Sequence, residues 1–422
     1  MESKSRICVV VDGYSTGRFL PSELKKHGVD CVHLQTTKDI PQFFKPSFHP
    51  NNFIDNIIHD GDVEKTLSKL SKFDIAFVIP GCDLGIELAD ILSEKLGLPS
   101  NGTQYSRARR NKFEMGEALR DFGVRAVNQI KSANLEEILS WVKELGEWPV
   151  VLKPVSSVCS DYVIFCENED DVISAFERII DSKNTLGTIN TEVLAQEFLS
   201  GTEYIVNTVS LEGQHYICDI WRYQKRKMPG YSKIYDFIEA LPFDDRFQNE
   251  FGNYIKQVLD ALRIQFGACH SEIMMTKNGP VLVEVNARLM GVIIPEVVSK
   301  GMQSNHVELT VKSYVEPDNF INIIKKSLSL QKNILIVILI SEVEGKIQSV
   351  SQMDLIRKLT SFCDMRLSIK KDGPINKTVD LSSSPGYIFL VHEYPEFIEQ
   401  DYQTIREREK KGLYDVISTV NV

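Results

Sequence analysis

Short apolar runs and amphipathic stretches alternate over the first hundred residues of the chain. Three apolar runs predict strands, at Arg6–Val11, Cys31–Leu34 and Ile75–Ile79, and the first of them is rich in β-branched residues. Between and after them, residues near Pro21–His27 and over Leu84–Lys95 have the spacing of helices. Strands separated by helices are typical of a parallel sheet with helices on its faces. We therefore expect an N-terminal α/β domain over residues 1–105.

The pattern changes after residue 105. Helical spacing covers Asn111–Phe122 and Leu135–Leu145, and Val150–Lys153 predicts a strand ended by Pro154. We expect a small subdomain over residues 106–190. Further along, three runs predict an antiparallel meander, at Val193–Phe198, Glu203–Leu211 and Gln214–Trp221.

Two later runs, Cys269–Thr276 and Pro280–Asn286, alternate on either side of Asn278-Gly279, a signal for a hairpin with a type I′ turn. We place a central subdomain over residues 191–325. Residues 326–422 begin with strands and end in a charged helix, which predicts a lid-like C-terminal α+β subdomain. The expected fold class is α/β at the N-terminus and α+β in the parts that follow.

Composition narrows the class of protein. Of the 422 residues, 43% are hydrophobic and 25% are charged, as in globular proteins. The net charge of −10 argues against nucleic acid as a main partner. The strongest apolar run, Asn333–Ile340, is far shorter than a membrane span. The eight scattered cysteines include no C-x-x-C pair, which favours reduced thiols and a cytoplasmic location.

The predicted hairpin carries a concentrated set of polar residues. Glu284 and Asn286 lie two apart on one strand and so project from the same face. Pairing about the turn brings Glu272 nearly level with Glu284. Two carboxylates that close repel each other unless a cation neutralises them, and hard oxygen ligands suit Mg²⁺. Arg288 shares this face and could stabilise an oxyanion. The alternative is an exposed, solvated face of an ordinary hairpin.

Two lysines and a serine-rich turn are candidates for phosphate binding. Lys153 ends an apolar strand, and the turn after it contains Ser156, Ser157 and Ser160. Backbone N–H groups and hydroxyls in such a turn can hold phosphate oxygens. Lys112 opens a predicted helix. Taken alone, a lysine at either position is usually a solvated surface residue.

The segment from Gln196 to Tyr204 leads from one strand through a tight turn into the next. Main-chain groups of Glu197, Phe198 and Leu199 could bond the edge of an adenine ring. The carboxylate of Glu203 could accept two ribose hydroxyls. The alternative is a hairpin with two surface glutamates.

The order of these motifs is more specific than any one of them. N-K-x-x-M is followed by V-x-K-P with its serine-rich turn, then by Q-E-F-x-x-G-x-E-Y, and finally by H-x-E and E-x-N-x-R. In this order, from about Lys112 to Lys312, the chain resembles the ATP-grasp superfamily. Within it, the chain looks like bacterial L-amino acid ligases, on the basis of Tyr14–Gly17, Cys269–Glu272, Asn286–Gly291 and Ser384–Tyr387.

The resemblance implies roles for individual residues. ATP would contact Lys112, Lys153, Ser156, Ser157, Ser160, Glu197, Phe198, Leu199 and Glu203. Magnesium, or manganese in its place, would bind as two ions to Glu272, Glu284 and Asn286. Arg288 and His270 would be catalytic, and the amino-acid pocket would contain His270, Arg288, Met290, Gly291 and Val292. One departure stands out, because residues 155–161 contain no glycine, whereas the superfamily's phosphate loop is usually glycine-rich.

The activity implied is that of an ATP-dependent ligase. An amino acid would be activated as an acyl phosphate and joined to an amine, giving a dipeptide, ADP and phosphate. The partners expected are small molecules only, with no membrane and no nucleic acid, and a homodimer stays open. Two alternatives remain: a ligase for another carboxylate or amine, and a non-catalytic ATP-binding regulatory protein. No G-x-x-x-x-G-K-[ST] occurs, which argues against a P-loop NTPase.

Overall fold

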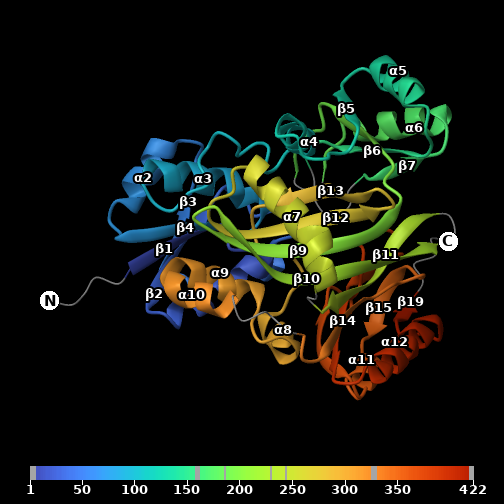
Figure 1. Ribbon diagram of the computed structural model, residues 1–422. Helices are drawn as coiled ribbons and strands as arrows, with labels where there is room; N and C mark the ends of the chain where they lie inside the picture. Colours follow the sequence, from blue (N-terminus) through green and yellow to red (C-terminus); the bar gives the residue numbers. More distant parts are fainter. Residues whose placement is uncertain are drawn as a thin grey trace.

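The computed structural model describes residues 6–156, 162–184, 187–228, 231–242, 245–324 and 330–417. Helices and strands form an N-terminal part, a small sheet with two helices, and a long central sheet that continues into the C-terminal part (Figure 1). Parallel and antiparallel sheets occur together, and the expected fold class is confirmed. Within the described ranges, no helix has the length and apolarity needed to cross a membrane.

The N-terminal part is a parallel sheet with strand order β3-β2-β1-β4. Its strands are β1 (Arg6–Val11), β2 (Val29–Gln35), β3 (Asp55–Ile58) and β4 (Ile75–Pro80). The accompanying helices are α1 (Leu20–Lys25), α2 (Val63–Leu70) and α3 (Ile86–Lys95). The loops after β1 and β4 touch through two glycines, since a Cβ on Gly17 would lie 2.2 Å from the carbonyl oxygen of Gly81. This contact brings both loops to the edge of the sheet where its strands end.

Asp12 is buried in the first of these loops and predicts a pH-dependent stability. It accepts hydrogen bonds from the backbone N–H and hydroxyl of Thr36, at 3.0 and 2.5 Å. Burial raises the pKa of Asp12 from 3.8 to about 6, against the effect of those bonds. At pH values between these two pKa values, Asp12 is therefore mostly protonated in the folded protein and mostly ionised in the unfolded chain.

Because the folded state binds this proton more tightly, the free energy of unfolding should fall as pH rises from about 4 to about 6. For Asp12 alone the decrease is at most about 3 kcal/mol. Asp12→Asn cannot ionise and should remove this part of the slope. Urea unfolding of both proteins at several pH values measures it, and parallel curves for the two would contradict the prediction.

The small sheet has strand order β5-β8-β6-β7. Its strands are β5 (Gln129–Ser132), β6 (Val150–Pro154), β7 (Ile164–Cys166) and β8 (Val193–Glu197), and its helices are α5 (Leu135–Leu145) and α6 (Glu169–Ile179). The expected meander is therefore wrong at its first strand. Val193–Glu197 pairs with β5 and β6 and not with the strand that follows it in sequence.

The central sheet has eight strands in the order β13-β12-β9-β10-β11-β14-β18-β16. Four strands of the first half are β9 (Gly201–Leu211), β10 (Gln214–Met228), β12 (Gly267–Thr276) and β13 (Gly279–Asn286). The other four are β11 (Tyr231–Leu241), β14 (Asn333–Ile338), β16 (Phe362–Leu367) and β18 (Gly386–His392). The helices of this part are α4 (Lys112–Asp121), α7 (Asp245–Ala261), α8 (Pro295–Gly301), α9 (His306–Val315) and α10 (Pro317–Ile324). The four-part division of the chain stays a proposal, and β11 and β14 pair directly across its boundary at residue 325.

The C-terminal part is fastened to this sheet by α12 (Pro395–Lys410), with α11 (Met353–Ile356) and the small strands β15 (Gly345–Ser349), β17 (Pro374–Ile375) and β19 (Asp415–Ile417) nearby. Arg406 of α12 is almost fully buried and pairs with Asp236 of β11 at 2.7 Å and with Glu409 at 2.6 Å. Its guanidinium also donates to the carbonyl oxygens of Asp236 and Ile338. Buried charges need partners of this kind, and the contacts of Arg406 with Asp236 and Ile338 fasten α12 to β11 and β14.

Candidate active site

The polar hairpin consists of β12 and β13, which lie next to the small sheet in Figure 1. Glu272 pairs with Glu284, as expected, and His270 pairs with Asn286. This pairing depends on a feature that was not expected: a bulge between Glu272 and Ile273, which shifts the register of the two strands by one residue. Among the turn residues only Gly279 has a positive φ, of 100°, so the predicted type I′ turn is wrong.

Lys112 extends from the neighbouring helix into this patch. The side chain of Asn111 caps α4 by accepting from the N–H groups of Phe113 and Glu114, which fixes Lys112 as the first helical residue. Its Nζ lies 2.9 Å from Oε1 of Glu284, and the side chain is only 10% exposed. Lys112 is therefore not the solvated helix residue of the alternative interpretation.

Lys153 is also buried, with 7% of its surface exposed. It lies on β6, where every residue is buried. Burial and the nearby charge of Lys112 lower the pKa of Lys153 to about 8, while Glu284, Glu272 and Glu203 oppose this. The interpretation of Lys153 as a surface lysine is wrong, and the charge of Glu284, the partner of Lys112, acts on its ammonium as well.

Arg288 follows β13 and is held by a residue that the sequence analysis did not identify. Its guanidinium pairs with Oδ1 of Asp83 at 3.0 Å and donates to the carbonyl oxygen of Leu289 at 2.9 Å. Burial lowers the pKa of Arg288, but the charge and hydrogen bond of Asp83 outweigh this and raise it. Asp83 follows the end of β4, and its place beyond a parallel strand's carboxyl end was a usable signal.

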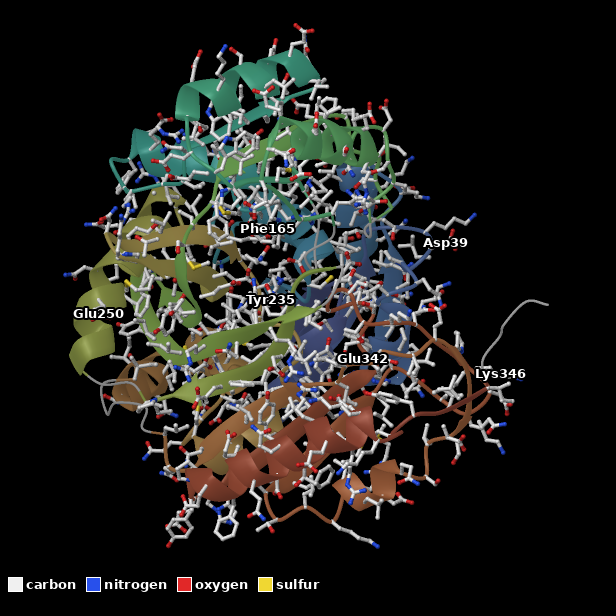
Figure 2. All side chains as sticks on the ribbon, turned by 90° about the vertical axis from the view of Figure 1, so that its right-hand side faces the viewer. Asp39, Phe165, Tyr235, Glu250, Glu342 and Lys346 are labelled. Atoms are coloured by element: carbon white, nitrogen blue, oxygen red, sulfur yellow. The ribbon has the colours of Figure 1, made fainter. Side chains whose placement is uncertain are left out.

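Glu203 has partners that were also missed. Its carboxylate pairs with Lys225 at 2.6 Å and accepts a hydrogen bond from the Tyr235 hydroxyl at 3.3 Å. Figure 2 shows Tyr235 in the inner part of the molecule, below Phe165 of the small sheet. Burial raises the pKa of Glu203, and Lys225 acts against this. Glu203 is 8% exposed, so it is not a surface glutamate.

His270 lies between two hydrogen-bonding partners on the same face. Its Nδ1 is 3.0 Å from Oδ1 of Asn207 and its Nε2 is 3.4 Å from Oε1 of Glu272. The Tyr223 hydroxyl also reaches Glu272, at 3.4 Å. Burial raises the pKa of Glu272, yet the hydrogen bond and charge of His270 outweigh it and the pKa lies below its usual range. Glu272 is therefore an ionised carboxylate, and its side chain is only partly buried.

The remaining candidates are less enclosed. The Glu197 carboxylate accepts a hydrogen bond from the backbone N–H of Asn128 at 2.9 Å. The ring of Phe198 packs edge-on against that of Phe165, with 5.7 Å between the ring centres. Leu199 lies between strands, where its main-chain groups are outside the ladder. The carbonyl oxygen of Ser156 accepts from Asn184 at 3.0 Å. Ser157 and Ser160 lie outside the described residues.

The candidate pocket segment runs from Met290 to Val292. Met290 is 2% exposed, and its sulfur accepts a hydrogen bond from the Asn207 amide at 3.2 Å. A Cβ on Gly291 would lie 3.8 Å from the hydroxyl of Ser15, so the N-terminal part borders this segment. Val292 has φ of 64°, which is a strained conformation for a β-branched residue.

The chemistry of this patch fits a small divalent cation better than a closed metal centre. In the described part of the chain, no three His, Cys, Asp or Glu side chains form a group that could hold a metal. Glu272, Glu284 and Asn286 offer two carboxylates and one amide oxygen. Mg²⁺ uses few protein ligands and completes its shell with water and phosphate oxygens, so this sparse set suits it.

Comparison with known proteins agrees with the motif order. Residues 146–296 match the model of an ATP-grasp domain. The chain is 31% identical to dapdiamide A synthase of Enterobacter agglomerans over 421 residues, covering 96% of each. It is 24% identical over 263 residues to an L-arginine-specific L-amino acid ligase of Bacillus subtilis, covering 60% of this chain and 61% of that protein.

The fold has close counterparts among solved structures. An L-amino acid ligase from Bacillus licheniformis superimposes with a TM-score of 0.75 at 16% identity, over 96% of this chain and 98% of that one. The full-length match in sequence, the domain match and the shared fold agree with one another. The chain therefore belongs to the ATP-grasp family of ATP-dependent amino-acid ligases.

Proposed function

We propose that the protein activates the carboxylate of one amino acid with ATP and joins it to the amine of a second. The carboxylate oxygen attacks the γ-phosphorus of ATP, which gives an acyl phosphate and ADP. The amine nitrogen then attacks the acyl carbon, loses a proton and expels phosphate. The observation that carries the proposal is the partly buried face on which Glu272 and Glu284 are paired in register, Lys112 pairs with Glu284, and the charges of Lys153 and Arg288 act on both carboxylates.

The residues of this face have different proposed roles, which follow from their charges. Lys112 and Lys153 bind phosphate oxygens, and Glu203 takes the ribose hydroxyls. Glu197, Phe198 and Leu199 present main-chain groups to adenine, and Ser156, where the serine-rich turn begins, is a further candidate to contact phosphate. In a buried site these charges are weakly screened, which makes their placement effective.

Glu272, Glu284 and Asn286 would hold Mg²⁺, as two ions by analogy with the family. When bound, the metal supplies charge that neutralises the phosphates and polarises the transferring group. Arg288, oriented by Asp83, offsets the negative charge of the acyl phosphate and of the tetrahedral oxyanion. His270 faces the amine and is the candidate to accept its proton. Met290, Gly291 and Val292 line the amino-acid pocket.

Lys225 and Tyr235 join this proposed set as residues that position Glu203. The ion pair of Lys225 with Glu203 is 2.6 Å long, and the Lys225 ammonium also lies 4.3 Å from the centre of the Tyr235 ring. The charge of Lys225 favours the ionised form of Glu203, against the effect of burial, which raises its pKa. An ionised carboxylate accepts hydrogen bonds from both ribose hydroxyls more strongly than a protonated one does.

The experiment is a measurement of ADP and phosphate release with Mg-ATP and the twenty common amino acids, singly and in pairs, with product analysis by mass spectrometry. Release that depends on two amino acids and yields a dipeptide supports the proposal. Release that needs a different carboxylate or amine indicates another ligase of the same fold. Binding of ATP with no stimulated release by any carboxylate–amine pair indicates a non-catalytic protein and overturns it.

A further inference from the structure

Two consecutive residues of β11 contact the same side chain of α12. The strand lies between β10 and the C-terminal part that contains α12 (Figure 1). Asp236 accepts a hydrogen bond from the Tyr402 hydroxyl at 2.9 Å, and the ring of Phe237 packs edge-on against that of Tyr402, with 5.2 Å between the ring centres. In a regular strand, successive side chains point to opposite faces of the sheet. The alternation of β11 is therefore interrupted at Asp236.

The interruption is a β-bulge in the pairing of β11 with β10. Gln224 pairs with Phe237, and the next residue of β10, Lys225, pairs with Tyr235. Asp236 is the extra residue and has no partner on β10. A shift of one residue exchanges the two faces of a strand. Without the bulge, Asp236 would lie opposite Lys225, and Tyr235 would point towards α12.

The bulge places Tyr235 in the candidate site. The Tyr235 hydroxyl donates to Glu203 at 3.3 Å, and its ring packs against that of Tyr223, with 4.7 Å between the centres. Lys225, which pairs with Glu203 at 2.6 Å, lies 4.3 Å from the centre of the Tyr235 ring. Neighbouring residues of β11 therefore serve different regions, because Tyr235 contacts the carboxylate proposed to bind ribose and Asp236 contacts α12.

A buried polar network fastens the bulge. Asp236 is 5% exposed and pairs in register with neither β10 nor β14 in the described ladders. Arg406 of α12 donates to its carbonyl oxygen at 2.7 Å, so this backbone group has a partner despite the gap in the ladder. The carboxylate accepts from Arg226 and from Tyr402, both at 2.9 Å, and forms an ion pair with Arg406 at 2.7 Å. In a buried site these attractions are weakly screened.

We propose that Asp236 and Tyr402 are positioning residues of the nucleotide site and act through this bulge. Their contacts hold the register of β11 in which Tyr235 meets Glu203 and Lys225. When the contacts are lost, the end of β11 that carries Tyr235 can shift by one residue, which removes its hydroxyl from Glu203. The inference rests on the proposed function, in which Glu203 takes the ribose hydroxyls. The contact between Tyr235 and Glu203, however, can be measured without any ligand.

The direct readout is the fluorine NMR spectrum of protein labelled with meta-fluorotyrosine, recorded without ligands. The Tyr235 signal is assigned by its loss in Tyr235→Phe. In the wild-type background, Glu203→Gln should displace this signal, because the carboxylate accepts a hydrogen bond from the labelled ring. In an Asp236→Ala background, the same change should leave the signal in place, since Tyr235 no longer meets position 203.

Equilibrium binding of ADP is the second readout. Asp236→Ala should weaken it by about 10- to 100-fold, as for residues that orient metal ligands. Tyr402→Phe loses one hydrogen bond and keeps the ring that packs on Phe237, so it should cost about 2- to 10-fold. Asp236→Asn keeps an acceptor at the bulge and should recover part of the affinity. In turnover, KM for ATP should rise in Asp236→Ala, and KM for the amino acids should stay the same.

Asp401→Ala is the matched control. Asp401 also lies on α12, is 6% exposed and accepts two hydrogen bonds from Ser361, the residue before β16. The substitution removes an equally buried carboxylate from the same helix without touching β11. It should destabilise the C-terminal part, while its ADP affinity and its Tyr235 signal should remain those of the wild type.

A Tyr235 signal that still responds to Glu203→Gln in the Asp236→Ala background overturns the proposal, whether or not the protein is active. An equal loss of ADP affinity in Asp401→Ala also overturns it, because the effect then reflects the stability of the C-terminal part alone. If Asp236→Ala does not fold, Tyr402→Phe decides, since an unchanged signal and unchanged ADP affinity in that variant contradict the proposal. A protein with the expected signals that binds ADP but joins no amino acids keeps this arrangement and overturns the proposed function.

Discussion

Replacing Glu284 with glutamine is expected to reduce turnover by at least about 100-fold. Even residues that only orient a metal ligand cost about 10- to 100-fold when replaced, and a proposed direct ligand should cost more. Glutamine keeps the size of the side chain but removes the charge that pairs with Lys112 and that would hold the proposed metal. Phosphate release with Mg-ATP and saturating amino acids measures the effect.

The control for this variant is Glu407→Gln, which makes the same change on the surface of α12, where the side chain is 66% exposed. It should have wild-type activity. Both variants should unfold in one cooperative thermal transition, because the glutamine at position 284 keeps its place in the β12–β13 ladder. Wild-type rates for Glu284→Gln would rule out a metal-binding role for this residue.

Replacing Arg288 with alanine is expected to lower kcat by about 100- to 1,000-fold while ATP affinity changes little. Groups aimed at the charge that develops during acyl transfer contribute to the rate by about this factor. Nucleotide binding would rest mainly on Lys112, Lys153 and Glu203, which the substitution leaves in place. Single-turnover ADP formation and equilibrium ATP binding separate the two effects.

Two companion variants sharpen this prediction. Arg288→Lys keeps the positive charge but not the planar fork, so it should recover only part of the rate. Asp83→Asn leaves Arg288 intact and removes the charge of its partner at 3.0 Å, so it should cost about tenfold. A loss confined to ATP affinity in Arg288→Ala would argue against its contact with the acyl phosphate.

Local sequence patterns predicted the paired carboxylates because a hairpin is a local structure. The positions of Glu272 and Glu284 follow from the turn between them, and alternation along each strand gives their common face. The bulge between Glu272 and Ile273 was not predicted, and the predicted turn centre was misplaced. The one-residue shift at the bulge compensates for the misplaced turn, so Glu272 still pairs with Glu284. Lys112 was placed equally well by its helix cap, Asn111.

Contacts between distant segments could not be predicted in this way. Asp83 and Arg288 are 205 positions apart, and no periodicity relates the end of β4 to the end of β13. The same limit explains why Lys225, Tyr235 and Asn207 were missed. Alternation shows which residues of a strand share a face, but it does not show which strands are neighbours. The misplacement of Val193–Glu197 has this cause, because its partners β5 and β6 precede it by many residues.

The pairing of β11 with β14 has a practical consequence for dividing the chain. A fragment that stops at residue 325 would retain every residue proposed to touch ATP. It would also lack β14, so Phe237–Glu239 of β11 would lose the strand with which they pair. A bare sheet edge of this kind invites pairing between molecules and precipitation. A minimal nucleotide-binding fragment of this protein therefore has to carry its last strands and α12 with it.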